Sequence, residues 1–139
     1  MKHTPAADDD AFVRAFEACQ IPPAPFDHAA HVRLAYIYLC ESNVDDAVAR
    51  MKQALLGFLA HVGVSESKYH ETITRAWVMA VAHFMAEGPP CGSAAAFIPA
   101  HPRLLDSKIM LTHYSAEVLF SPEARRAFVG PDISSIPEH

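Results

Sequence analysis

The sequence has no long apolar run and no excess of basic residues, and these two absences exclude several classes of protein. The longest nearly unbroken apolar run covers residues 76–86, which is too short for a membrane-spanning helix of roughly 20 residues. Lys and Arg number 11 against 16 Asp and Glu, which gives a formal net charge of −5. Such a chain offers little basic surface to the phosphates of nucleic acids or anionic lipids. We therefore expect neither a nucleic-acid partner nor a membrane partner.

The N-terminal segment, MKHTPAADDD, lacks the basic start and the apolar centre of a signal peptide. The three cysteines, Cys19, Cys40 and Cys91, lack the CxxC spacing of metal and redox sites. Their odd number and their spacing are typical of reduced thiols. Both observations predict a cytoplasmic protein.

Sequence motifs for nucleotide and hydrolase chemistry are missing as well. The chain contains no GxGxxG, P-loop, GxSxG or HExxH segment, so none of the enzyme classes that depend on them is predicted. No Val- or Ile-rich stretch alternates with polar residues between turn residues. We therefore predict no β-strand.

Proline is absent from residues 26–88 although the chain contains 11 prolines, and a proline-free stretch is where long helices can form. We predict four main helices: one that follows Asp8–Asp10 and stops at Ile21–Pro25, one from the N-cap Asp27 to about Glu41, one from the N-cap Asn43 to Gly63, and one from Ser65 or Ser67 to Glu87. The third carries apolar residues at alternating steps of four and three, which is typical of a buried helix face. These residues are Val44, Val48, Met51, Leu55, Phe58 and Val62.

The C-terminal third is richer in proline and predicts shorter elements. We expect short helices at residues 93–98, 103–113 and 122–128, the last with Ser121 as N-cap and Pro122 in its first turn. The tail after residue 130 is expected to be extended. The predicted fold is all-α: one helical bundle domain over residues 1–139, with a core at about 8–88 and an irregular helical third at 89–139.

Nine histidines are the unusual feature of the composition. His28 and His31 stand three residues apart at the start of the second predicted helix, in the segment Phe26–His31. Residues three apart share one helix face, so both imidazoles can reach the same metal ion.

A third histidine, His70, is expected at the same end of the bundle. If the four helices alternate in direction, the second and fourth run parallel, and their first turns lie together. His70 falls in a row with Ile73, Trp77, Val81 and Phe84, which predicts that it faces the core. The positive end of a helix dipole also favours neutral histidine, the form that binds metals.

These three residues predict one divalent transition metal held by His28, His31 and His70. Zinc, copper, iron and nickel all accept imidazole ligands, and the sequence does not choose among them. Three histidines leave a coordination position open, as in catalytic sites. The prediction is a metal-dependent enzyme that acts on a small molecule, by hydrolase or lyase chemistry with zinc or by oxidation with copper or iron.

The proton-transfer groups predicted for this enzyme are Glu71 and Tyr114. Glu71 follows His70 directly, and Tyr114 lies at the end of the predicted helix 103–113, which can fold back toward the histidines. The fourth metal ligand is left open among His113, Glu71 and water.

Three other interpretations of the same residues stay open. The histidines can be core residues whose nitrogens bond to backbone carbonyls, or His70 and Glu71 can form an acid–base pair without a metal. The third is a non-catalytic metal- or ligand-binding module or accessory subunit. The sequence is compatible with a monomer and with a homo-oligomer.

Three segments of the chain also resemble a group of small, uncharacterised bacterial proteins. These segments are FDHAAHVRLAYIYL, KYHETITRAWV and LLDSK…HYSAEVLFSPEARRAFVGPD. The group shares a Phe-x-His-x-x-His segment, a Tyr-His-Glu-Thr segment and a Ser-Pro-Glu-Ala-Arg segment. The resemblance covers roughly residues 26–133 and implies no particular activity.

Overall fold

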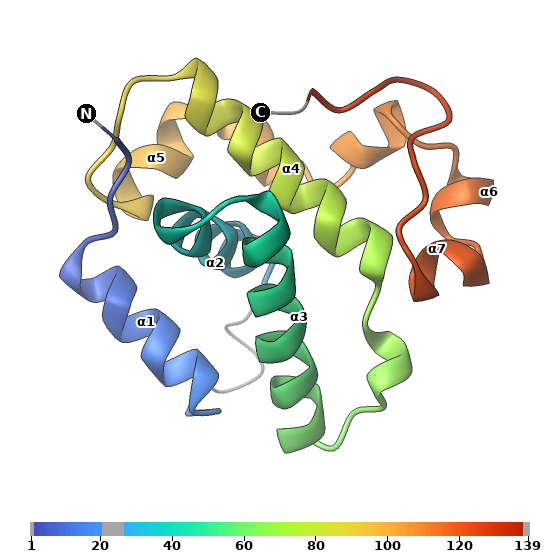
Figure 1. Cartoon of the computed structure of the whole chain (residues 1–139), viewed down its shortest axis with the longest axis horizontal. Helices are drawn as coiled ribbons and strands as arrows, with labels where there is room; N and C mark the ends of the chain where they lie inside the picture. Colours follow the sequence, from blue (N-terminus) through green and yellow to red (C-terminus); the bar gives the residue numbers. More distant parts are fainter. Residues whose placement is uncertain (1, 21–26, 138–139) are drawn as a thin grey trace.

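Helices α2, α3 and α4 pack on one another at the centre of the protein (Figure 1). The computed structural model describes residues 2–20 and 27–137, and within them it contains helices and no strands. The α-helices are α1 (Ala7–Glu17), α2 (His28–Glu41), α3 (Val44–His61), α4 (Glu71–Glu87), α5 (Ala94–Ala100), α6 (Ala116–Leu119) and α7 (Pro122–Arg126). Three 3-10 helices join them: η1 (Glu66–Lys68), η2 (Pro102–Leu105) and η3 (Ile109–Thr112). The predicted all-α fold is confirmed.

The predicted N-caps hold helices α2 and α3 at the expected residues. The Asp27 side chain accepts a hydrogen bond from the backbone N–H of Ala30 at 3.0 Å. Asn43 accepts one from the N–H of Asp46 at 2.9 Å. Each cap satisfies a backbone donor that the helix itself leaves unpaired. Helix α3 ends before Gly63, whose φ of +75° suits glycine because glycine has no Cβ.

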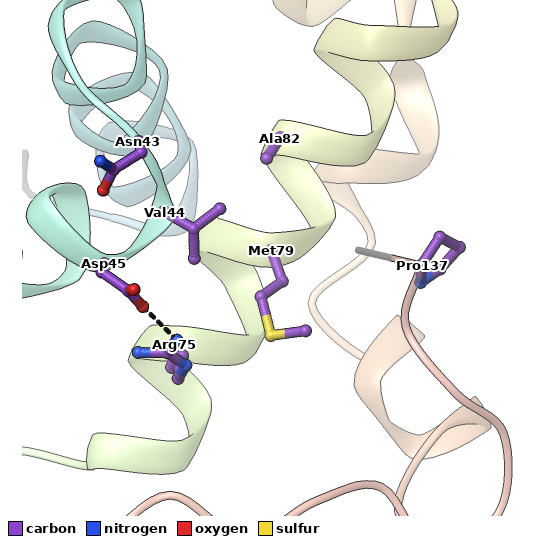
Figure 2. Close-up of a pocket in the computed structure, with 7 residues that line it drawn as sticks. All are labelled: Asn43, Val44, Asp45, Arg75, Met79, Ala82 and Pro137. Atoms are coloured by element: carbon purple, nitrogen blue, oxygen red, sulfur yellow. Dashed lines mark hydrogen bonds and ion pairs between the residues drawn. The ribbon is translucent and has the colours of Figure 1, made fainter. Parts of the chain in front are cut away.

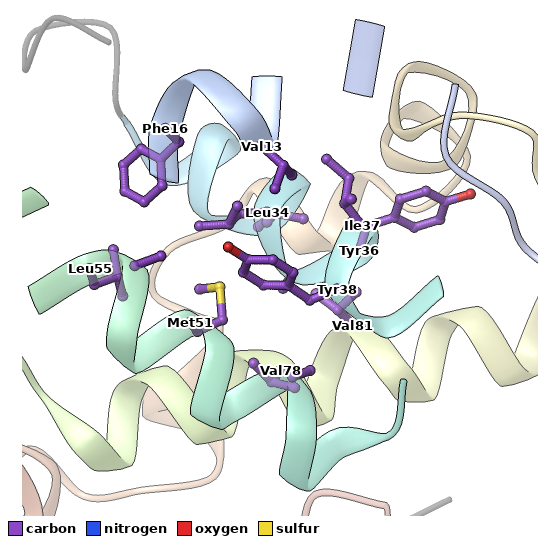
Figure 3. Packing of buried hydrophobic residues seen from close by; sticks show 14 of the residues in the cluster. Val13, Phe16, Leu34, Tyr36, Ile37, Tyr38, Met51, Leu55, Val78 and Val81 are labelled. Carbon is purple, nitrogen blue, oxygen red and sulfur yellow. The ribbon is translucent and has the colours of Figure 1, made fainter. Parts of the chain in front are cut away.

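The main core lies between α1, α2, α3 and α4, as Figure 3 shows for part of the cluster. The predicted apolar face of α3 is confirmed at its centre, where Val48, Met51, Leu55 and Phe58 are buried, whereas Val44 and Val62 at its two ends are half-buried. Helix α2 adds Tyr38, whose hydroxyl donates to a carboxylate oxygen of Glu17 in α1 at 2.9 Å. A buried tyrosine needs such a partner, and this one fixes α1 against α2.

The start of α4 differs from the prediction. Residues 66–68 form a 3-10 turn, and α4 begins at Glu71 with His70 as its N-cap. The predicted core row on α4 is also only partly correct, because Ile73, Trp77 and Phe84 are half-buried whereas Val81 is fully buried. Thr72, Ala76 and Met79 are buried on another side. The C-terminal third covers that side, so α4 has two buried faces.

The C-terminal third packs on α4 around a second cluster that includes Met79, Met110, Tyr114, Leu119 and Ile136. The single helix predicted over 103–113 is wrong: this stretch forms two 3-10 helices separated by a turn. Helix α6 was not predicted, because its four residues are too few to show a period.

The short helix after Ser121 agrees with its prediction. Ser121 accepts a hydrogen bond from the N–H of Ala124, and Pro122 occupies the first helical turn. The tail over residues 131–137 forms no helix. No helix in the described ranges is long and apolar enough to cross a membrane. Residues 21–26, which include Phe26 and the predicted stop Ile21–Pro25, lie outside those ranges.

Candidate functional site

His28, His31 and His70 line the same pocket, as the sequence predicts for their positions. The pocket has a volume of about 530 Å³ and lies between α2, α3, α4 and the C-terminal third. We call it the histidine pocket. Its lining residues are Asp27, His28, His31, Ala35, Met51, Leu55, Phe58, Leu59, Lys68, Tyr69, His70, Ile73, Thr74, Trp77, Phe120 and Arg125.

His28 is the first residue of α2 and is tied to the C-terminal third. Its Nε2 donates a hydrogen bond to the carbonyl of Leu104 at 2.8 Å. Its ring meets the Trp77 indole edge-on, with the ring centres 4.4 Å apart. These two contacts fix the position of the His28 ring.

His31 lies one turn further along α2. Its Nδ1 donates to the backbone carbonyl of Asp27 at 3.1 Å, which fixes the orientation of the ring. Burial lowers the pKa of His31 below its ordinary value, and the neighbouring His28 lowers it further. Desolvation disfavours the charged form, so His31 is neutral at pH 7.

His70 is the most constrained of the three histidines. Its Nδ1 accepts a hydrogen bond from the backbone N–H of Ile73 at 3.1 Å, and its Nε2 donates to the carbonyl of Leu119 at 2.8 Å. Burial lowers its pKa, and the Arg125 guanidinium lowers it further, against the opposing effect of the Leu119 carbonyl. Both ring nitrogens of neutral His70 are therefore engaged in hydrogen bonds.

This arrangement does not fit a three-histidine metal centre. A metal ligand must offer a lone pair, and the lone pair of His70 already accepts the hydrogen bond from Ile73. Among the described residues, no group of three or more His, Cys, Asp or Glu side chains is placed to hold a metal ion. The structure brings the three predicted residues to one pocket, but with their nitrogens directed toward different partners.

Glu71 and Tyr114, the predicted proton-transfer residues, do not line the histidine pocket. A Glu71 carboxylate oxygen lies 3.8 Å from the Lys52 ammonium. The Tyr69 hydroxyl is buried close to Glu71, but the two side chains are outside hydrogen-bonding geometry. Glu71 therefore faces α3.

Tyr114 is fully buried in the second cluster, where its hydroxyl donates to the carbonyl of Val129 at 2.6 Å. Its neighbour His113 is also outside the pocket, because its Nδ1 donates to the carbonyl of Ser134 at 2.7 Å. Both residues therefore bond to the backbone near the C-terminal end of the chain, at Val129 and Ser134.

Two cationic residues of the pocket were not predicted. Arg125 donates from Nη1 to the carbonyls of Ser67 and Lys68, at 3.1 and 3.4 Å. Lys68 itself is exposed and lines the same pocket. No local pattern marks these residues as neighbours, because 57 positions separate them in the chain. The one available signal was the Ser-Pro-Glu-Ala-Arg segment that ends in Arg125.

A smaller pocket of about 250 Å³ lies between the start of α3 and the middle of α4 (Figure 2). An ion pair between Asp45 and Arg75 forms one of its walls, and Met79 and Pro137 form another (Figure 2). Because its two opposite charges neutralise each other, this pocket offers less binding chemistry than the histidine pocket.

No protein-family model, curated protein or solved structure matches the chain. The histidine pocket is therefore the basis on which we assign a function.

Proposed function

We propose that the protein binds a small, largely apolar molecule in the histidine pocket. The observation that carries this proposal is the combination of apolar walls with three imidazoles whose orientations are fixed by backbone carbonyls. Small-molecule sites in proteins are concave and mostly apolar, with a few polar groups placed to orient the ligand.

The size and lining of the pocket agree with such a ligand. Its volume of about 530 Å³ falls within the range of roughly 300–1,000 Å³ that small-molecule sites occupy. Helices α3 and α4 supply most of the apolar wall, through Met51, Leu55, Phe58, Leu59, Ile73 and Trp77. An apolar molecule that enters displaces water from this surface, which favours binding.

His31 and His70 add polarity to the pocket without charge. Burial keeps His31 and His70 neutral, so neither repels an apolar ligand as a buried cation would. His28 and His31 each donate to a backbone carbonyl, so the orientations of both rings in the pocket wall are fixed.

A neutral apolar dye tests this function directly. N-phenyl-1-naphthylamine carries no charge and becomes fluorescent in apolar surroundings, so its titration reports occupation of the pocket. We expect saturable binding of one dye per chain. Leu59→Trp fills part of the pocket and should weaken binding by about tenfold or more, which corresponds to about 1.4 kcal/mol.

The matched control is Leu111→Trp, which adds the same ring at an exposed position outside the pocket. This variant should bind the dye as the parent does, and thermal melts followed by circular dichroism establish that both variants fold. Equal binding by the two variants, or no saturation in the parent, would overturn the proposed function.

A second candidate is the metal-dependent enzyme with His28, His31 and His70 as ligands. The observation in its favour is that all three imidazoles line one pocket with an open side. This candidate requires His70 to release the Ile73 N–H before its Nδ1 can bind a metal. Metal content therefore separates the two candidates.

A further inference from the structure

Three cations gather beside the histidine pocket although the chain as a whole is acidic, with a net charge of −5. Lys68 and Arg125 line the pocket itself. Arg126 lines a neighbouring groove, which also contains Lys52 and Arg125. None of Lys68, Arg125 and Arg126 forms an ion pair within the described ranges.

The neighbouring groove, which we call the basic groove, adjoins the histidine pocket directly. Tyr69 and Arg125 border both hollows. Arg125 is held in place because one of its nitrogens donates to two backbone carbonyls. A guanidinium carries five N–H donors, so this one keeps further donors for an anion.

Asp27 and Glu66 are the carboxylates that line these two hollows, and Glu71 lies outside both. Glu71 pairs with Lys52, so these two charges offset each other. Asp27 uses one oxygen as the N-cap of α2. Glu66 is exposed and borders only the basic groove. The three unpaired cations therefore outnumber the two carboxylates, Asp27 and Glu66, and the net charge around the two hollows is positive.

From this juxtaposition we propose that the ligand is an amphipathic anion, with its apolar body in the histidine pocket and a carboxylate or phosphate between Lys68, Arg125 and Arg126. This inference rests on the proposed function and specifies the class of its ligand. Arginine suits both kinds of head group, because its planar fork matches the oxygens of a carboxylate or a phosphate.

The test uses alkyl probes that share a ten-carbon chain and differ in their head groups. Decanoate and decyl phosphate are anions, decanol is neutral and decyltrimethylammonium is a cation. Each probe is titrated against the protein loaded with N-phenyl-1-naphthylamine. We expect each anion to displace half of the dye at about one tenth of the concentration that decanol requires. The cation should be the weakest competitor.

Ionic strength and charge-removing variants then locate the head group. Salt screens exposed charges, so added NaCl should weaken the anions and leave decanol unchanged. Lys68→Gln with Arg126→Gln should reduce the preference for anions over decanol by about tenfold. The matched control is Arg103→Gln with Lys108→Gln, which removes two exposed cations outside both hollows.

The outcomes separate this inference from the proposed function. If the dye binds and the anions compete no better than decanol, the anion site is refuted and the apolar pocket stands. If the dye does not bind, the proposed function itself fails. An unchanged anion preference in the Lys68→Gln, Arg126→Gln variant, or binding of the protein to anionic vesicles without binding to free decanoate, would also overturn the inference.

Discussion

The side chain of His70 joins the start of α4 to the C-terminal third, because its Nε2 donates to the carbonyl of Leu119 at 2.8 Å. The opposite ring nitrogen accepts the backbone N–H of Ile73, which makes His70 the N-cap of α4. One imidazole thus fixes a helix start, holds a segment 49 positions away, and forms part of the pocket wall.

His70→Ala should lower the free energy of unfolding by about 2–3 kcal/mol, because it removes a cap and leaves the Leu119 carbonyl without its donor. His70→Asn should recover about 1 kcal/mol of this loss, since asparagine is a good N-cap. Urea denaturation measures both values. His61→Ala is the matched control, because His61 is exposed, and its stability should match that of the parent.

The pH dependence of stability follows from the same residue. Burial lowers the pKa of His70 below the ordinary value of 6.5, so the folded state favours the neutral imidazole. Protonation would place a hydrogen on Nδ1, where the Ile73 N–H already points. The stability from this group is therefore complete above pH 6.5 and is lost as the pH falls through the lowered pKa.

Urea midpoints at several values between pH 8 and pH 5 test this expectation. The parent should lose stability below about pH 6.5, and His70→Asn should show a smaller loss over the same interval. His31 and His101 also have lowered pKa values from burial, so the variant should retain part of the dependence. Identical slopes for parent and variant would show that His70 does not titrate as the structure indicates.

Thr72 attaches the segment that follows α7 to α4 through two hydrogen bonds. Its hydroxyl donates to the carbonyl of Ala127 at 3.0 Å and accepts from the N–H of Val129 at 3.0 Å. Thr72→Val keeps the shape but removes both bonds, so we expect a loss of about 1–3 kcal/mol in urea denaturation.

The matched control for this substitution is Thr112→Val, at an exposed threonine whose hydroxyl bonds only within its own 3-10 turn. It should lose at most about 0.5 kcal/mol. A Thr72→Val protein as stable as this control would show that the segment after α7 does not depend on Thr72.

The elements that the sequence predicted well are set by neighbouring residues. The N-cap bond of α2 joins Asp27 to Ala30, only three positions away, and such a bond follows from the local residue types. The apolar face of α3 shows a regular period for the same reason. His70 was missed as an N-cap because histidine is not among the usual capping residues.

The convergence of His28, His31 and His70 was predictable from helix order, whereas bonding of their nitrogens to backbone carbonyls was only one of the interpretations that the sequence left open. The partners of His28 and His70 are backbone carbonyls 76 and 49 positions away. These carbonyls belong to η2 and α6 in the C-terminal third, whose helices are too short to show a periodic pattern. For the same reason, the sequence did not predict that Arg125 lines the pocket or that α4 has a second buried face.

Trp77 is the only tryptophan of the chain, and it lines the histidine pocket against the ring of His28. Its fluorescence should therefore change when the pocket is filled by decanoate. Trp77→Phe should keep the fold and bind the neutral dye with little change. Trp77→Ala should lose about 3 kcal/mol of stability, since it removes a large ring that packs on both core clusters. A Trp77 spectrum unaffected by saturating decanoate would place the ligand elsewhere.

Metal content is the prediction that separates the apolar binder from the three-histidine enzyme. Protein purified without a histidine tag is dialysed against zinc, copper, iron or nickel and then analysed for bound metal. Because the lone pair of His70 is occupied by the Ile73 N–H, we expect no stoichiometric metal at pH 7. Where weak uptake occurs, the His70→Ala protein should take up as much as the parent.

A different pattern of metal content would support the three-histidine enzyme. One metal per chain, lost in His28→Ala, His31→Ala and His70→Ala but kept in His83→Ala, would establish the three-histidine centre. His83 is the control because it lies further along α4 and does not line the pocket. Such a centre would require the bond between Ile73 and His70 to open, so the amide of Ile73 should then exchange with solvent faster when metal is bound. Slower exchange at Ile73 on metal addition would mean that the ion binds without His70.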